Sequence, residues 1–147
     1  MFKPKSNRRG AAAVEFAIVA PLFVLLLLGM LEVGHSINIT SMLANAAREG
    51  ARVAVSDEPT TTTAKVNSAV ISYLTTAGAY GHDANGAPRP VTDAVVTITP
   101  PGWETLPAGE AIQVQVTLDR TKVSWVKNNF IQSNPTYTAA MRKEGTQ

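Results

Sequence analysis

Residues 8–31 read RRGAAAVEFAIVAPLFVLLLLGML, and this stretch decides how the rest of the chain is organised. From Phe16 to Leu31 no side chain is charged. Extending the run back to Ala11 gives about the 20 residues that a helix needs to cross a bilayer. The extension includes one carboxylate, Glu15. Because an ionised side chain at the centre of a membrane helix costs about 2.5–3.5 kcal/mol on insertion scales, this glutamate requires a partner.

The spacing of Glu15 indicates what that partner is. A basic cluster ends at Gly10, and a cut after Gly10 would create a new amine on Ala11. Ala11 and Glu15 are four residues apart, which is about one turn of α-helix. We therefore interpret Glu15 as a carboxylate placed to meet a newly formed N-terminal amine.

The charge of the chain is unevenly distributed. Four cations precede the apolar run and leave a net charge of −2 on the residues after Gly10; they are Lys3, Lys5, Arg8 and Arg9. The overall charge of +2 therefore belongs to the leader and does not indicate nucleic-acid binding. Because Lys and Arg flank only one side of the run, the positive-inside rule predicts that residues 1–10 stay cytoplasmic and that residues from about 33 onward are translocated.

A conventional cleaved signal peptide also has a basic start and an apolar centre. Two features disfavour it. The alanines at 11–13, which resemble a cleavage site, lie before the apolar run rather than after it, and Glu15 interrupts a segment that should be uncharged. A further alternative keeps the segment as a permanent signal anchor of a periplasmic binding or adhesive domain, with Glu15 incidental.

The transmembrane helix, residues 11–32, is predicted to continue through residues 33–55. Apolar and small side chains recur there at steps of three and four and polar side chains fill the other side, which is typical of an amphipathic helix. A narrow surface of small residues would let another helix approach closely. These helix-packing candidates are Ala46, Ala47, Gly50 and Ala51. The alternative is that they pack on the protein's own sheet.

Residues 56–147 are predicted to form a small extracytoplasmic α+β domain. Pro59 ends the long helix. A second amphipathic helix over residues 66–74 ends at Gly78, and three strands follow a Gly- and Pro-rich loop. The predicted loop is 78–90, and the predicted strands are 94–99, 112–118 and 136–142. Helices followed by strands predict an α+β fold, with the long N-terminal helix packed on one face of a small antiparallel sheet. Residues 121–134, around Trp125, allow a crossing loop with a short helical turn.

No group of residues has the pattern of an active site or a metal centre. The two histidines, His35 and His82, lack further ligands at matched spacing, and the chain has no cysteine. The serines lack the flanking motifs that supply a nucleophile with its base. The glycine-rich residues 78–86 lack the strand before and helix after that a phosphate loop requires. We therefore expect a protein that is not an enzyme, without cofactor, metal or small-molecule substrate.

The N-terminal motif resembles a known class of leader. A basic segment, Gly10, four residues, then Glu15, Phe16 and an apolar run is similar to a type IV prepilin leader. More narrowly, four stretches resemble the TadE-like family, whose members are minor pilins or pseudopilins of the tight-adherence (Flp) pilus apparatus. These stretches are VEFAIVAPLF at 14–23, LLGMLEVG at 27–34, ANAAREGARVA at 44–54 and TAAMRKE at 138–144.

The resemblance implies a pilin-like fold, a processing step and a location. A prepilin peptidase would cut between Gly10 and Ala11 on the cytoplasmic side of the bacterial inner membrane. Glu15 would then be the fifth mature residue, followed by the aromatic Phe16, and would neutralise the N-terminal amine of a neighbouring subunit. The implied partners are membrane lipid, the peptidase, and other pilins with their assembly machinery. Because Flp pilins are very short, the domain after residue 55 favours a minor or initiating subunit.

Overall fold

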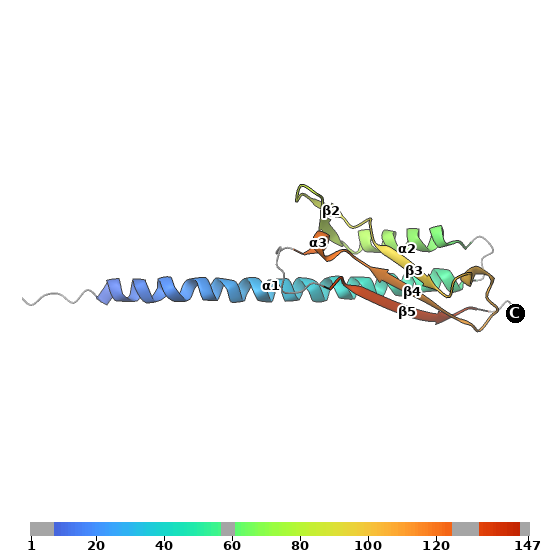
Figure 1. Ribbon diagram of the computed structural model, residues 1–147, viewed down its shortest axis with the longest axis horizontal. Helices are drawn as coiled ribbons and strands as arrows, with labels where there is room; N and C mark the ends of the chain where they lie inside the picture. The colour runs from blue at the N-terminus through green and yellow to red at the C-terminus, as the bar shows by residue number, and fades with distance from the viewer. Residues whose placement is uncertain (1–7, 57–60, 125–132, 145–147) are drawn as a thin grey trace, which may run out of the picture. The chain divides into compact units, whose positions relative to one another are not determined.

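The computed structural model describes residues 8–56, 61–124 and 133–144. The chain divides into two compact units, Met1–Gly34 and His35–Gln147. One long helix, α1 (Arg8–Val55), begins in the first unit and ends in the second (Figure 1). The predicted continuation of the apolar helix to about residue 55 is therefore confirmed.

Within the described residues of the first unit, the only regular element is the N-terminal part of α1. Pro21 lies inside this helix, and the surrounding apolar run remains helical on both sides of it. A proline is tolerated in helices of this composition because neighbouring groups can satisfy the freed carbonyl.

The second helix, α2 (Thr63–Thr76), has defined signals at both ends. The hydroxyl of Thr62 accepts a hydrogen bond from the amide of Lys65, which satisfies one of the free amides of the first turn. At the other end Gly78 has a φ of 76°, and the amides of Gly78 and Ala79 donate to the carbonyls of Thr75 and Leu74. This is a Schellman end, and it confirms the predicted termination at Gly78.

Three antiparallel strands form the main sheet in the order β3-β4-β5: β3 is Val95–Thr99, β4 is Ala111–Thr117 and β5 is Thr136–Arg142. The register pairs Thr97 with Gln115 and Gln115 with Thr138. All three predicted strands are confirmed within one residue at each end. From Ala111 to Val116 the residues of β4 alternate between exposed and buried, because helices cover only one face of this sheet.

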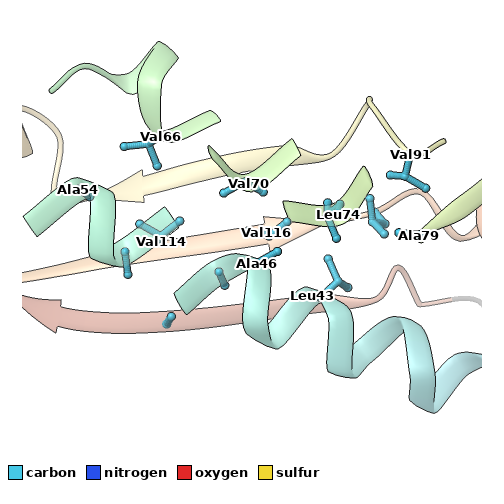
Figure 2. Close-up of a cluster of buried hydrophobic side chains, with 14 of the residues drawn as sticks. Leu43, Ala46, Ala54, Val66, Val70, Leu74, Ala79, Val91, Val114 and Val116 are labelled. Atoms are coloured by element: carbon cyan, nitrogen blue, oxygen red, sulfur yellow. The ribbon is translucent and has the colours of Figure 1, made fainter. Parts of the chain in front are cut away.

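The hydrophobic core lies between that sheet face and the two helices (Figure 2). α1 contributes small residues and Leu43, α2 contributes a stripe three to four residues apart, and β4 contributes its alternate side chains. The largest fully buried side chains are Leu43, Leu74, Ile112, Leu118, Val66, Val70, Val114 and Val116. Trp103, in the short 3-10 helix Trp103–Thr105 between β3 and β4, is also buried. The α+β prediction is therefore confirmed.

The predicted loop at 78–90 is wrong in part, because it contains a small antiparallel hairpin of β1 (Tyr80–His82) and β2 (Pro88–Pro90). The Asp83 carboxylate closes its turn by accepting hydrogen bonds from the amides of Asn85 and Ala87, each at 2.8 Å. Such three-residue strands are too short to show alternation in a sequence.

The short helix α3 (Arg120–Val123) provides the helical turn predicted near residues 121–134. The Asp119 side chain accepts from the amide of Thr121 at its N-terminus. The rest of that predicted segment up to residue 132, including Trp125, lies outside the described residues.

Candidate functional site on the N-terminal helix

The apolar part of α1 is exposed along its whole length within the first unit. Its most apolar stretch buries none of its residues inside the protein, and Phe16 is 73% exposed. Soluble monomers rarely expose a continuous apolar patch larger than a few hundred Å². By length and composition this helix is able to span a membrane once, as the sequence predicted.

The predicted cleavage site, Gly10 and Ala11, lies in the first turns of this helix, and both residues are exposed. A Cβ atom added at Gly10 would meet nothing within 4 Å. Gly10 also does not have the positive φ that favours glycine. The fold of this chain therefore gives no reason for a glycine at position 10, so a requirement for glycine there would have to come from a partner.

Glu15 is exposed on the same helix, one turn beyond Ala11. Among the described residues, no hydrogen bond or ion pair is recorded for its carboxylate. Phe16 is exposed beside it. The structure thus holds the predicted assembly residues Glu15 and Phe16 on one exposed turn of the first unit.

The small residues proposed for helix packing have a different environment. Ala46, Ala47 and Ala51 are fully buried within the second unit. A Cβ atom at Gly50 would lie 2.7 Å from Cγ2 of Val70 on α2 and 3.2 Å from Cγ1 of Val114 on β4. The surface predicted as available to another subunit is therefore covered by the chain's own helix and sheet, and the alternative interpretation is the correct one for these four residues.

The opposite side of this part of α1 is polar. Arg52 forms a two-point ion pair with Glu49, at 2.6 and 2.9 Å. The hydrogen bonds from Arg52 hold the pKa of Glu49 below its ordinary value, against a smaller upward effect of burial. Arg48 donates to the Tyr137 hydroxyl at 3.3 Å, and its guanidinium lies 5.7 Å from the Tyr137 ring centroid. This places α1 directly beside β5.

The structure brings together one polar group that the sequence did not indicate. The Asp93 carboxylate accepts hydrogen bonds from Arg89 at 2.8 Å and from Lys122 at 2.5 Å. Lys122 and then Arg89 hold the pKa of Asp93 below its ordinary value. Arg89 and Lys122 also line an open cavity of about 710 Å³, whose other lining residues are His82, Asp83, Ala84, Gly86, Thr121 and Ser124. Lys122 is 29 residues from Asp93 in sequence, so only the fold could reveal this cluster.

The two histidines lie apart from any cluster of ligands. His35 is half-buried, and its Nε2 atom lies 2.7 Å from the carbonyl oxygen of Val123. His82 lies on the hairpin, at the edge of the polar cavity. In the part of the chain that the structure describes, no group of three or more His, Asp or Glu side chains is arranged to hold a metal ion.

The comparisons with known proteins concern the same helix. The model of the TadE-like protein family matches residues 10–52. The match begins at Gly10 and ends three residues before the end of α1. No curated protein and no solved structure matches the chain. The match to the TadE-like family thus lies on α1, from Gly10 to Arg52, and does not extend into the domain after this helix.

Proposed function

We propose that this chain is a non-enzymatic minor pilin or pseudopilin that takes part in assembling a tight-adherence (Flp) pilus. The observation that supports this most directly is Glu15, a carboxylate on a fully exposed apolar helix. The family match begins at Gly10, five residues earlier. In this proposal, residues 11–32 cross the inner membrane once, with the basic residues before Gly10 on the cytoplasmic side.

Processing is the first step of the proposal. A prepilin peptidase cuts between Gly10 and Ala11 and removes the basic leader. The empty space around Gly10 supports this step, because the protein's own structure would accept a side chain there. The small size of the residue then matters to the peptidase rather than to the fold.

Assembly is the second step. The new amine of Ala11 and the Glu15 carboxylate are each costly to hold in lipid alone, and they offset one another when they pair. Pairing between neighbouring subunits fixes their axial register, because a shifted neighbour would leave both charges without a partner. The proposed partners are therefore lipid, the peptidase, other pilins and their assembly machinery.

Processing is tested by mass spectrometry of the N-terminal peptide of the protein from membranes that contain the peptidase. The proposal expects a peptide that begins at Ala11, and a Gly10→Leu variant that retains Met1 and the full leader. Gly29→Leu is the matched control, since Gly29 is equally free of neighbours but lies away from the cleavage site. A wild-type protein that still begins at Met1 would contradict processing.

Assembly is tested with Glu15→Ala. We expect this variant to be cleaved normally, to keep a folded second unit and to lose pilus assembly, because only the proposed amine partner is removed. Glu49→Ala is the control, since this carboxylate lies in the second unit and pairs with Arg52. Normal piliation in the Glu15→Ala strain would contradict the pairing.

The polar cavity favours a second candidate function, that of an anchored periplasmic binding or adhesive domain. The cavity is open and lined by charged and hydroxyl side chains from the hairpin and α3. Under this alternative, Lys122→Ala would abolish surface adhesion while Glu15→Ala would leave it unchanged. The pilin proposal expects the reverse.

A further inference from the structure

The two edges of the main sheet run in the same direction. β3 and β5 each pair antiparallel with β4, so they are parallel to one another on opposite sides of the central strand (Figure 1). An edge strand presents amide and carbonyl groups that can pair with another strand. A sheet with two parallel edges can therefore be extended by a second copy of itself in the same orientation.

Two backbone hydrogen bonds at the ends of the β4–β5 ladder establish which backbone groups of β5 point outward. The amide of Lys143 donates to the carbonyl of Glu110, and the amide of Leu118 donates to the carbonyl of Pro135. Both bonds follow the register of β4 and β5, and paired residues alternate between bonded and non-bonded positions in an antiparallel ladder. The backbone groups of Tyr137, Ala139 and Met141 consequently point to β4. Those of Thr136, Thr138, Ala140 and Arg142 point to the free edge.

The same alternation applies to β3. The β4 residues that do not bond β5 bond β3 instead, so Val95, Thr97 and Thr99 point inward. The outward groups on this edge belong to Val96 and Ile98. Within the described chain, no backbone hydrogen bond is recorded for these outward groups or for those of Thr138 and Ala140.

The outer strands lack the features that normally protect such edges. Native proteins place lysine, proline or a bulge on an exposed edge strand. β3 has the sequence VVTIT, with five β-branched residues, and Val95 is 63% exposed. The first five residues of β5, TYTAA, are also uncharged and contain no proline. Charged or rigid residues follow only at the far ends, at Pro100 and Arg142.

We propose that the β3 edge of one copy pairs in parallel with the β5 edge of a second copy and continues the sheet between them. This proposal depends on the membrane anchoring in the proposed function, because that anchoring selects the partner. Parallel pairing of β3 with β5 keeps the second unit of every copy in the same orientation, which suits copies that are anchored in one membrane. Antiparallel pairing of two β3 strands would instead reverse the strand direction of one copy relative to the other.

The side chains fit this pairing. In a parallel pair, a residue whose backbone amide and carbonyl bond the neighbouring strand lies opposite a residue whose own amide and carbonyl point away from that pair. The side chains of two such opposite residues lie on the same face of the sheet. Val96 and Ile98 then lie beside Tyr137 and Ala139, all on the half-buried or buried face. On the open face, Thr97 lies opposite Thr138 or, two residues further along, opposite Ala140. Because the contact is head-to-tail, it can repeat from copy to copy.

The chain has no cysteine, so introduced thiols report this contact without interference. The test uses full-length protein in native membranes with Thr97→Cys and Thr138→Cys on one chain, and a second pair with Ala140→Cys in place of Thr138→Cys. Within one chain, positions 97 and 138 both pair with Gln115 and are two strand spacings apart, about 9.5 Å. This exceeds the Cα separation of about 7 Å that a disulfide can bridge, so oxidation can link only separate copies.

We expect mild oxidation to produce dimers, trimers and longer species from at least one double-cysteine chain. Each single-cysteine chain should stay monomeric, and an equal mixture of the two singles should stop at dimers. The matched control mixes Thr97→Cys chains with Gln115→Cys chains. Gln115 is also exposed on the open face but lies in the central strand, so this mixture should not form links. Dimers from either single variant, links to Gln115→Cys, or no links from either pair would each overturn the proposal.

A backbone variant tests the hydrogen bonds themselves. In the Thr97→Cys and Thr138→Cys chain, Ala140→Pro removes an outward amide whose side chain is exposed, and we expect the linked species to disappear. Ala140→Ser keeps the amide and should keep the links. Persistent links in the proline variant, with the domain resistant to protease, would overturn edge pairing.

The two proposals fail separately. A correctly cleaved protein whose Glu15→Ala variant loses piliation but whose edges never link would overturn only the edge pairing. Linked edges in a protein that retains Met1 would overturn only the processing.

Discussion

Residues 11–33 and 39–55 belong to one helix, yet they are adapted to different surroundings. Every apolar side chain in the first stretch is exposed within its unit apart from the half-buried Ala20, whereas the second buries its small residues under α2 and β4. The first is apolar around the helix apart from Glu15 and Glu32, and the second is amphipathic. Both stretches are helical, so helicity alone does not indicate whether a helix packs on the rest of its own domain. The distribution of polar residues around the helix does indicate it.

The family match covers the first stretch and the second as far as Arg52, but the two have separate consequences for the protein. The second stretch contributes to the core of the second unit, and the first contains Glu15 and begins directly after Gly10. Substitutions of the same type placed in both halves should therefore affect different measurements. In the first half they should change insertion, processing or assembly, and in the second half the free energy of unfolding.

The largest expected difference in the free energy of unfolding is between alanine substitutions of two leucines, one in each stretch. Leu43 is fully buried and Leu26 is exposed. Leu43→Ala should lower the free energy of unfolding of the domain by about 2–5 kcal/mol, because it removes buried methyl groups and leaves a cavity. Leu26→Ala should leave that free energy unchanged. Denaturant titration of both full-length variants in the same detergent, followed by tryptophan fluorescence, measures the difference. Equal losses would contradict the division of α1 into two environments.

A smaller difference in the free energy of unfolding is expected between alanine substitutions of two glycines, one in each stretch. Alanine at Gly50 places a Cβ atom 2.7 Å from the Val70 side chain, whereas alanine at Gly29 meets nothing within 4 Å. Overpacking costs about 1–3 kcal/mol, and the better helix propensity of alanine returns about 0.5–1 kcal/mol. Gly50→Ala should therefore destabilise the domain on the order of 1 kcal/mol, and Gly29→Ala should not. The same denaturant titration measures the free energy of unfolding of both alanine variants. A Gly50→Ala protein at least as stable as the wild type would contradict the expectation and show that the Val70 side chain moves aside without cost.

These two positions also show how far the sequence could be interpreted. The helices, the three strands and the end of the second helix at Gly78 were predictable because each has a local signal in periodicity or turn chemistry. The packing partner of Gly50 was not predictable from the sequence. A small residue permits another segment to approach closely but does not specify which segment it is. Only the position of α2 and β4 decides between a partner subunit and the protein's own core.

Polar contacts between residues far apart in the chain, and the short hairpin, were also not predictable from the sequence. The Asp93 cluster joins a loop to α3 across 29 residues, and the β1–β2 hairpin is held by Asp83 bonding its own turn. Neither has a repeating pattern that a sequence can show. Glu15 is the opposite case, because a single carboxylate in an apolar run is visible in the sequence without any structure.

The smallest expected difference in the free energy of unfolding concerns two of the three glutamates of α1, Glu15 and Glu49. The pKa of Glu49 is lowered in the folded protein by the hydrogen bonds from Arg52. The unfolded chain therefore takes up a proton at higher pH than the folded chain does. The stability from this pair is fully present above the ordinary glutamate pKa and is lost as pH falls through the lowered value. Because the pair is on the surface, Glu49→Gln should cost only about 0.3–0.5 kcal/mol at pH 7.

Denaturant titrations from pH 7 to pH 3 check this expectation, with Glu15→Gln as the control from the exposed half of the helix. The gap between wild type and Glu49→Gln should close toward pH 3, because protonation removes the same charge that the substitution removes. At pH 7, Glu15→Gln should have the same free energy of unfolding as the wild type, since this exposed carboxylate lies outside the second unit. A Glu49→Gln gap that stays constant to pH 3 would mean that side-chain packing, and not charge, joins Glu49 to Arg52. The polar side of α1 would then contribute to stability in the same way as its buried side.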